Sequence, residues 1–164
     1  MALTWSCRHE NRPANHLQLI ETVAMILLDT NVVFEMMRAE PDPSVDSWSA
    51  SQVAETLFFS AVGEAELRYG AAIRPKGRRR DYLVSDIEGM LRNVFEGRVL
   101  PLDSNAAREY AGIIAGRRRM GRPISQADGQ IAAIARSQRL AVATRNVRDF
   151  EDIGIDVIDP WASG

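Results

Sequence analysis

Short apolar runs alternate with longer segments of helical periodicity from residue 25 to the end of the sequence. The run Met25-Ile-Leu-Leu28 is apolar throughout, which is typical of a strand buried on both faces of a sheet. Residues 126–138 instead place apolar side chains three and four positions apart, as an amphipathic helix does. The pattern predicts strands at residues 25–28, 57–59, 99–102, 140–143 and 156–158, and helices at residues 32–38, 45–51, 61–73, 81–95, 106–120 and 126–138.

Short strands separated by helices predict an α/β fold. We expect an α/β/α sandwich whose short-stranded, mainly parallel central sheet is covered by helices on both faces. Residues 1–24 are polar and mixed and show no clear period. We therefore expect a poorly ordered N-terminal extension before a single domain at residues 25–164.

The apolar runs are too short for a membrane segment. None approaches the roughly 18 residues that a membrane-spanning helix needs. The longest run near the N-terminus, residues 23–28, is also too short for the apolar part of a signal peptide. A single cysteine excludes a disulfide framework within the chain. These features favour a cytoplasmic protein.

Histidine and cysteine occur only near the N-terminus, at Cys7, His9 and His16. Residues 25–164 therefore contain no Ser–His–Asp triad, no thiol nucleophile and no imidazole acid–base pair. They also lack the nitrogen and sulfur ligands of a typical zinc site. An enzyme built from this segment has to use carboxylates, hydroxyls and a cation that prefers oxygen ligands.

The net charge of −2 does not by itself indicate a nucleic-acid binder, but the cations are clustered in two runs. The first consists of Lys76, Arg78, Arg79 and Arg80, and the second of Arg117, Arg118, Arg119 and Arg122. A local basic patch can contact phosphates whatever the total charge is. The alternative is that both runs are solvated helix ends or loops.

Asp29 follows directly after the first predicted strand and is followed by Thr30 and Asn31. In open α/β sheets, ligands bind beyond the carboxyl ends of the strands. The position of Asp29 after a wholly apolar strand therefore favours a functional site. The alternative is that one of these three residues only caps the next helix.

Glu66 interrupts an apolar stripe on the predicted helix 61–73. The stripe consists of Val62, Ala65, Tyr69 and Ile73. Glu64 lies off the stripe and can pair with Arg68 four residues later. A carboxylate on the core-facing side of a helix needs a partner or a cation, unless Glu66 lies at the edge of the stripe or makes a buried hydrogen bond.

Asp128 has two compatible interpretations. The sequence from Ser125 to Asp128 matches a helix capping box, in which Asp128 would sit in the first helical turn. Asp128 also shares its helix face with Ile131, Ala132 and Ala135, and so points along the stripe expected to be buried.

Polar residues also follow the strand predicted at residues 140–143. Thr144 and Asn146 could form hydrogen bonds at the carboxyl edge of the sheet, and Asp149 adds an acid; each could instead belong to a turn or cap. Three or four acids brought together would repel each other unless a divalent cation, Mg²⁺ or Mn²⁺, neutralised them. Such a cation activates water and shields a phosphate under attack. Hydrolysis of a nucleic-acid phosphodiester accounts for all these features.

Together, these motifs resemble the PIN-domain ribonuclease toxins of the VapC type, most closely the FitB branch. The resemblance rests on Met25-Ile-Leu-Leu-Asp-Thr-Asn31, Ala65-Glu-Leu-Arg-Tyr-Gly70, Ile124-Ser-Gln-Ala-Asp-Gly-Gln-Ile-Ala-Ala133, Val142-Ala-Thr-Arg-Asn146 and Asp159-Pro-Trp161. It covers residues 25–164 and leaves residues 1–24 unmatched. It implies a PIN-like nuclease domain.

The resemblance also assigns roles to the polar residues of these motifs. Asp29, Glu66 and Asp128 match the family's three acidic metal ligands and catalytic residues, and Thr30, Asn31 and Thr144 match the polar residues that support them. Asn146 departs from the pattern, because some relatives have a fourth aspartate there. We expect one firmly bound Mg²⁺ and another recruited by the substrate, with Asn146 and Asp149 as candidate auxiliary ligands.

The implied activity is that of an Mg²⁺- or Mn²⁺-dependent endoribonuclease, the toxin of a toxin–antitoxin pair. A small antitoxin with a DNA-binding domain is the implied partner, RNA (often transfer RNA) the implied substrate, and a homodimer the usual assembly, with no membrane involved. The expected RNA contacts are Arg117, Arg118, Arg119, Arg122 and Arg145.

Three alternatives remain open at this point. A phosphatase with an aspartate nucleophile would need a second acid two residues after Asp29, where this chain has Asn31. A receiver domain would use clustered acids and Mg²⁺ but would not need Glu66. A PIN fold that only binds RNA or a partner, without cleaving RNA, is the main alternative that is not an enzyme.

Overall fold

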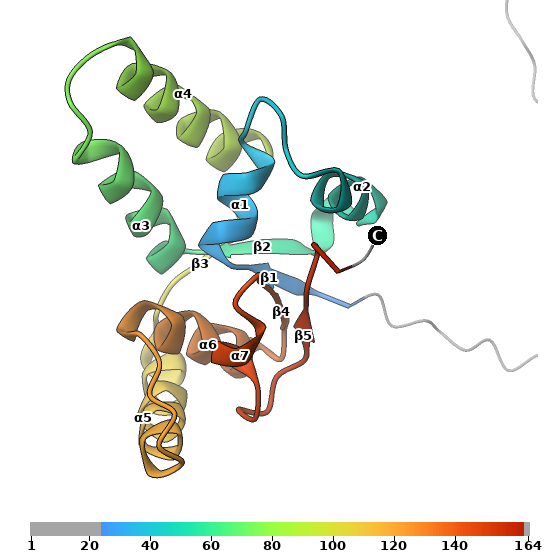
Figure 1. Ribbon diagram of the computed structural model, residues 1–164. Coiled ribbons are helices and arrows are strands. Elements are labelled where there is room, and N and C mark those ends of the chain that lie inside the picture. Colours follow the sequence, from blue (N-terminus) through green and yellow to red (C-terminus); the bar gives the residue numbers. More distant parts are fainter. Residues whose placement is uncertain (1–23, 163–164) are drawn as a thin grey trace, which may run out of the picture.

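The computed structural model describes residues 24–162, which form a five-stranded sheet in the order β3-β2-β1-β4-β5 (Figure 1). All four neighbouring strand pairs are parallel, so the predicted parallel α/β sheet is confirmed. The strands are β1 (Ile26–Leu28), β2 (Leu57–Ser60), β3 (Val99–Leu100), β4 (Ala141–Ala143) and β5 (Val157–Ile158). The extension predicted for residues 1–24 lies, except for Ala24, outside the described residues.

Helices cover both faces of the sheet, as predicted (Figure 1). One face carries α1 (Thr30–Met36), α2 (Pro43–Ser51), α3 (Ala61–Ala72) and α4 (Arg78–Asn93). The other carries α5 (Ser104–Arg119), α6 (Gln126–Gln138) and α7 (Val147–Phe150). The six predicted helices are present with small shifts at their ends, whereas α7 and the 3-10 turn η1 (Ala54–Thr56) were not predicted. No helix within residues 24–162 is long and apolar enough to cross a membrane.

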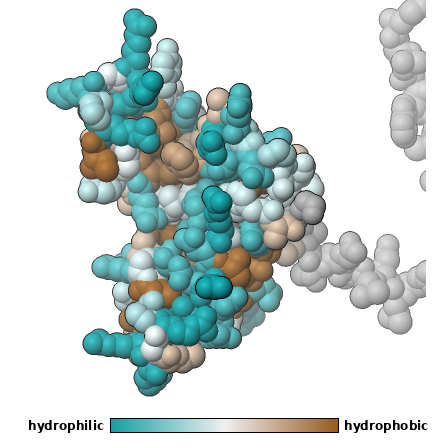
Figure 2. Space-filling view, viewed as in Figure 1, coloured by the Kyte–Doolittle hydropathy of each residue, from teal (hydrophilic) through white to brown (hydrophobic). Residues whose placement is uncertain are grey.

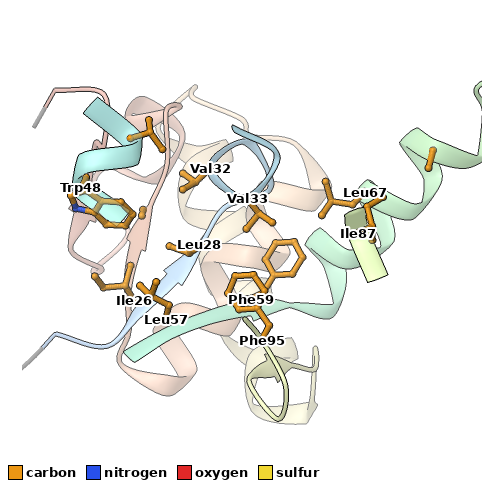
Figure 3. Packing of buried hydrophobic residues seen from close by; sticks show 13 residues of the cluster. Ile26, Leu28, Val32, Val33, Trp48, Leu57, Phe59, Leu67, Ile87 and Phe95 are labelled. Carbon is orange, nitrogen blue, oxygen red and sulfur yellow. The ribbon is translucent and has the colours of Figure 1, made fainter. Parts of the chain in front are cut away.

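The central strand β1 separates two hydrophobic cores because successive side chains of a strand point to opposite faces. Ile26 and Leu28 pack with residues of α1 to α4, and Leu27 packs with residues of α5 to α7. In the first core, the rings of Phe59 and Phe95 stack with their centroids 5.3 Å apart (Figure 3). The wholly apolar sequence of β1 is thus explained by burial on both faces.

Side chains cap the helices α1, α3 and α6, which carry the acidic candidates. Asp29 caps α1, and Ser60 caps α3 by accepting a hydrogen bond of 2.9 Å from the amide of Gly63. Ser125 caps α6 by accepting a hydrogen bond of 3.0 Å from the amide of Asp128. These caps begin the helices at defined residues and so fix where the first-turn side chains lie.

Helices α3 and α4 form an antiparallel hairpin held by ion pairs. Arg68 on α3 donates hydrogen bonds to Glu64 (2.7 Å) and to Glu88 on α4 (2.5 Å). The predicted pairing of Glu64 with Arg68 is therefore confirmed. In the same view as Figure 1, the molecular outline is indented between the hairpin and the part formed by α5 and α6 (Figure 2).

Candidate active site

The candidate site lies where the strand order reverses. From β1 the chain proceeds to β2 and β3 on one side, and then to β4 and β5 on the other. The carboxyl ends of β1 and β4 therefore lie side by side, and the connections that follow them lead to opposite sides of the sheet. Open α/β sheets bind ligands at such a point. Asp29 follows β1 and Thr144 follows β4 at this point.

Asp29 is only 3% exposed and accepts hydrogen bonds at both carboxylate oxygens. Its Oδ2 atom accepts from the Thr144 hydroxyl (2.7 Å) and from Nδ2 of Asn31 (2.9 Å), and its Oδ1 atom accepts from the Thr30 amide (2.7 Å). Burial raises the pKa of Asp29 to about 6, and the negative charges of Asp128 and Glu66 also raise it. The hydrogen bonds lower the pKa but do not offset the burial.

Glu66 and Asp128 are held by hydroxyl groups. The Thr30 hydroxyl donates a 2.5 Å hydrogen bond to Oε2 of Glu66, and the Ser125 hydroxyl donates a 2.6 Å hydrogen bond to Oδ2 of Asp128. Both proposed roles of Asp128 are thus compatible with its position, because it lies in the capped first turn of α6 and also lines the pocket described below.

The prediction that Glu66 lies within a buried apolar stripe is wrong. Tyr69 and Ile73 are 67% and 64% exposed, and Glu66 itself is exposed. Helix α3 instead buries the neighbouring face with Gly63, Leu67 and Ala71. The stripe has the correct period, but α3 is packed on its other side by α1 and α4, so the stripe faces outward.

The three acids line one pocket of about 360 Å³. They belong to the start of α1, the middle of α3 and the start of α6, and are distant from one another in the sequence. The pocket is lined by Asp29, Thr30, Asn31, Phe34, Glu66, Leu67, Gly70, Arg74, Leu83, Asp128 and Asn146. Phe34, Leu83 and Arg74 were not predicted as part of the site.

The remaining polar candidates lie at or beside this pocket. The hydroxyl of Thr144 contacts Asp29, and the backbone N–H of Asn146 donates a 2.9 Å hydrogen bond to that hydroxyl. Asp149 does not line the pocket; it lines a neighbouring one together with Arg145 and Asn146. Asn146 is therefore the auxiliary candidate that the structure brings to the three acids.

The donor chemistry of the pocket fits a hard divalent cation. Its charged groups near the sheet edge are carboxylates, and Asn146 offers an amide oxygen, which are the ligands that Mg²⁺ prefers. Within residues 24–162, no three acidic side chains converge closely enough to form a preassembled metal site. Instead, hydroxyl groups hold each of the three carboxylates.

The predicted RNA contacts on α5 and in the turn that follows it divide into three kinds. Arg117 is only 3% exposed and donates hydrogen bonds to the carbonyl oxygens of Glu151 (3.1 Å) and Arg148 (3.2 Å), so its prediction as an RNA contact is wrong. Arg122 pairs with Glu151 and Asp152. Arg118 and Arg119 are exposed.

Arg145, the remaining predicted RNA contact, lies beside the pocket. Its guanidinium group lies over the ring of Trp161, 5.3 Å from the centroid, and its amide donates a 3.2 Å hydrogen bond to Asn31. This residue therefore links the loop after β4 to the start of α1.

Arg74 was missed because it was not part of either basic run. It lies just beyond the end of α3 at Ala72, so the helix pattern did not mark it as part of the site either. The pocket therefore contains a cation at some distance from its carboxylates.

Residues 26–156 match the PIN domain family, and the chain belongs to that family. The VapC ribonuclease Y4jK of Sinorhizobium fredii is 46% identical to it over 137 residues, which are 84% of this chain and 98% of that protein.

Two solved structures have the same fold. FitAcB from Neisseria gonorrhoeae has a TM-score of 0.78 and 39% identity, covering 84% of this chain and 99% of that one. DNA-bound VapBC from Salmonella typhimurium has a TM-score of 0.70 and 30% identity, covering 84% of this chain and 98% of that one. The resemblance to VapC and FitB proteins, and the PIN fold, are thus confirmed.

Proposed function

We propose that this PIN-domain protein is an Mg²⁺-dependent endoribonuclease and the toxin of a toxin–antitoxin pair. The observation that carries the proposal is that Asp29, Glu66 and Asp128 all line one pocket, at the point where the strand order reverses. The name of the Sinorhizobium fredii relative, a ribonuclease, supports the activity.

In this proposal, Asp29, Glu66 and Asp128 hold Mg²⁺, or Mn²⁺ in its place, with Asn146 as a neutral auxiliary ligand. When bound, the cation neutralises the charge of the scissile phosphate and lowers the pKa of water for attack on the phosphodiester. Without a fourth carboxylate at position 146, a second cation would be held more weakly.

The neighbouring side chains orient the carboxylates. Thr144 and Asn31 both donate to Oδ2 of Asp29 and so fix its rotation. Thr30 performs the same function for Glu66, and Ser125 for Asp128. Partners of this kind keep ligands in position and tune their basicity.

The pKa of Asp29 near 6 couples the carboxylate to cation binding. Close to neutral pH, a fraction of Asp29 carries a proton, because burial disfavours its charge. A cation in the pocket would displace that proton, so metal binding should release protons and should weaken as the pH falls.

The proposal includes a small antitoxin with a DNA-binding domain and a homodimer of this chain. The DNA-bound VapBC complex supports the antitoxin. Exposed apolar side chains on α1, α3 and α4 also favour a protein partner: Phe34, Tyr69, Ile73 and Tyr82. Large exposed apolar side chains gathered in one region are typical of interaction surfaces.

Cleavage of RNA by the purified chain, with Mg²⁺ and with EDTA, tests the activity. We expect cleavage only with the metal, and its loss in Asp29→Asn and in Asp128→Asn. Asp86→Asn, which removes an exposed carboxylate on α4, is the charge-matched control and should cleave normally. RNA binding without cleavage in the wild type would leave a binding module, and phosphate release from small esters would indicate a phosphatase.

A further inference from the structure

The strongest concentration of positive charge lies on the connection between α3 and α4. Residues 74–80, which we call the basic segment, contain five cations and no acid. The cations are Arg74, Lys76, Arg78, Arg79 and Arg80. Hydrophilic side chains project from this end of the α3–α4 hairpin (Figure 2).

These cations have no acidic partners within the fold. Among residues 24–162, the ion pairs of arginines are those of Arg38, Arg68, Arg122 and Arg136, and none involves the basic segment. At the end of α5, by contrast, Arg122 is paired and Arg117 is buried. The basic segment therefore has the larger unneutralised charge, although the sequence pattern suggested the end of α5.

Charge of this kind is unfavourable for the free protein. Arg78, Arg79 and Arg80 occupy the first turn of α4, where the helix dipole disfavours cations, and they repel one another; the single acid Asp81 in the same turn offsets only part of this charge. The arrangement lowers the stability of the hairpin unless an anion binds there. Departures from local stability rules of this type are expected at functional sites.

The basic segment is continuous with the acidic pocket. Glu66, Gly70 and Arg74 all line that pocket; from Glu66 the helix rises about 9 Å to its end at Ala72, and Arg74 follows two residues later. Arg74 also lines an adjoining pocket of about 410 Å³ formed by residues 74–80. The ion pair of Arg68 with Glu88 links α3 to α4, which carries Arg78, Arg79 and Arg80.

We infer that the basic segment binds the phosphodiester backbone of the substrate RNA on one side of the cleavage point. The inference rests on the proposed nuclease function. An RNA whose scissile phosphate lies at the carboxylates has to leave the pocket, and Arg74 lies on a route that leads to four further cations. A span of at least about 9 Å corresponds to about three phosphates or more at the spacing of a stacked strand, so a very short RNA does not reach the segment.

The test compares two double variants of equal charge change. Arg78→Gln with Arg79→Gln alters the basic segment, and Arg92→Gln with Arg108→Gln alters two exposed arginines on α4 and α5 that are not among the expected RNA contacts. Binding of a long single-stranded RNA is measured over a series of salt concentrations in EDTA, which prevents metal-dependent cleavage. Thermal melting of each variant checks that it is folded.

We expect the basic-segment variant to reduce the magnitude of the salt slope by about one to one and a half, because each phosphate contact contributes about 0.7 to it for single strands. The control variant should keep the wild-type slope. With Mg²⁺, cleavage of a short RNA that spans only the scissile bond should be equal in all three proteins, whereas cleavage of the long RNA should weaken only in the basic-segment variant.

An unchanged slope in the basic-segment variant, or an equal loss in both variants, overturns the inference. If the slope is unchanged, an acidic protein surface would explain the basic segment better than RNA does. Cleavage by the wild type reports separately on the proposed function. A chain that binds RNA through the segment but does not cut it would refute the nuclease and leave only RNA binding by the segment.

Discussion

The Thr144 hydroxyl, at the end of β4, donates a 2.7 Å hydrogen bond to Oδ2 of Asp29, at the end of β1. The same hydroxyl accepts a 2.9 Å hydrogen bond from the amide of Asn146, and it lies 3.4 Å from Nδ2 of Asn31. One buried hydroxyl thus links two strands to the first acid of the pocket. Predictions are made below for Thr144, for the pKa of Asp29, for Arg117 and for Gly63.

Replacing Thr144 with Val should weaken Mg²⁺ binding while keeping the side-chain shape. The hydroxyl lowers the pKa of Asp29, so its loss leaves more of the carboxylate protonated and less firmly oriented. Loss of such a supporting group typically weakens metal affinity about 10–100-fold. The measurement is the Mg²⁺ concentration needed for half-maximal cleavage. Thr56→Val, in η1, is the control, and an equal effect in both variants would contradict the assigned role.

The stability of the metal-free protein should fall as the pH rises from about 4 to about 7. Asp29 has a folded pKa of about 6, above its ordinary value of 3.8, so the folded state binds the extra proton. The protonated Asp29 carboxyl stabilises the folded state fully below its unfolded pKa, and this stabilisation is lost as the pH rises through the folded pKa. The free energy of unfolding should fall by about 3 kcal/mol over this range.

Urea unfolding in EDTA at several pH values measures this dependence. Asp29→Asn should flatten it in that range, because the titrating group is gone. Mg²⁺ should restore stability to the wild type at neutral pH but not to the variant. If wild type and variant show the same pH dependence in EDTA, Asp29 is not the group responsible.

Arg117→Ala should destabilise the fold by about 2–4 kcal/mol, because two hydrogen bonds from a buried cation to carbonyl oxygens are lost. These carbonyls belong to Arg148 and Glu151, at the end of α7, so the change should loosen the segment that follows Asn146. Denaturant unfolding measures the loss. Arg118→Ala, at an exposed position in the same turn, should change stability by less than about 0.5 kcal/mol. Similar values for both variants would contradict a structural role for Arg117.

Gly63→Ala should impair both stability and cleavage. A Cβ atom at this position would lie 2.6 Å from Cε2 of Phe59 and 3.1 Å from the hydroxyl oxygen of Thr30, which holds Glu66. Overpacking of this kind costs about 1–3 kcal/mol. Gly89→Ala, in α4, has open space around the new Cβ and should stabilise the protein by about 0.5–1 kcal/mol. Wild-type melting and cleavage in Gly63→Ala would show that this close contact is unimportant.

The elements with strong local patterns were predictable from the sequence. The apolar run of β1 located the first strand and hence Asp29, and the period of residues 126–138 gave the bounds of α6. Helix α7 is only four residues long, too short to show a period. Its position depends on Arg117, whose partners are about thirty residues away in the sequence.

The incorrect predictions concern which face of a helix is covered by other parts of the protein. Periodicity placed Tyr69 and Ile73 on one side of α3, but it could not show that α1 and α4 pack on the other side. Likewise, a run of three arginines does not reveal which one points inward, because successive residues of a helix are about 100° apart. Arg117 faces the protein, whereas Arg118 and Arg119 face outward.

The strand order also determines when the pocket can form during synthesis on the ribosome. Strand β1 is made first, but its neighbour β4 comes almost at the end of the sequence, with 115 residues separating Asp29 from Thr144. At roughly 5–20 residues per second, this interval lasts on the order of ten seconds. Until β4 emerges, a nascent chain has neither Thr144 to hold Asp29 nor a complete edge on which to place Asp128. If the proposed function is correct, a nascent chain that still lacks β4 would not cleave RNA at this pocket.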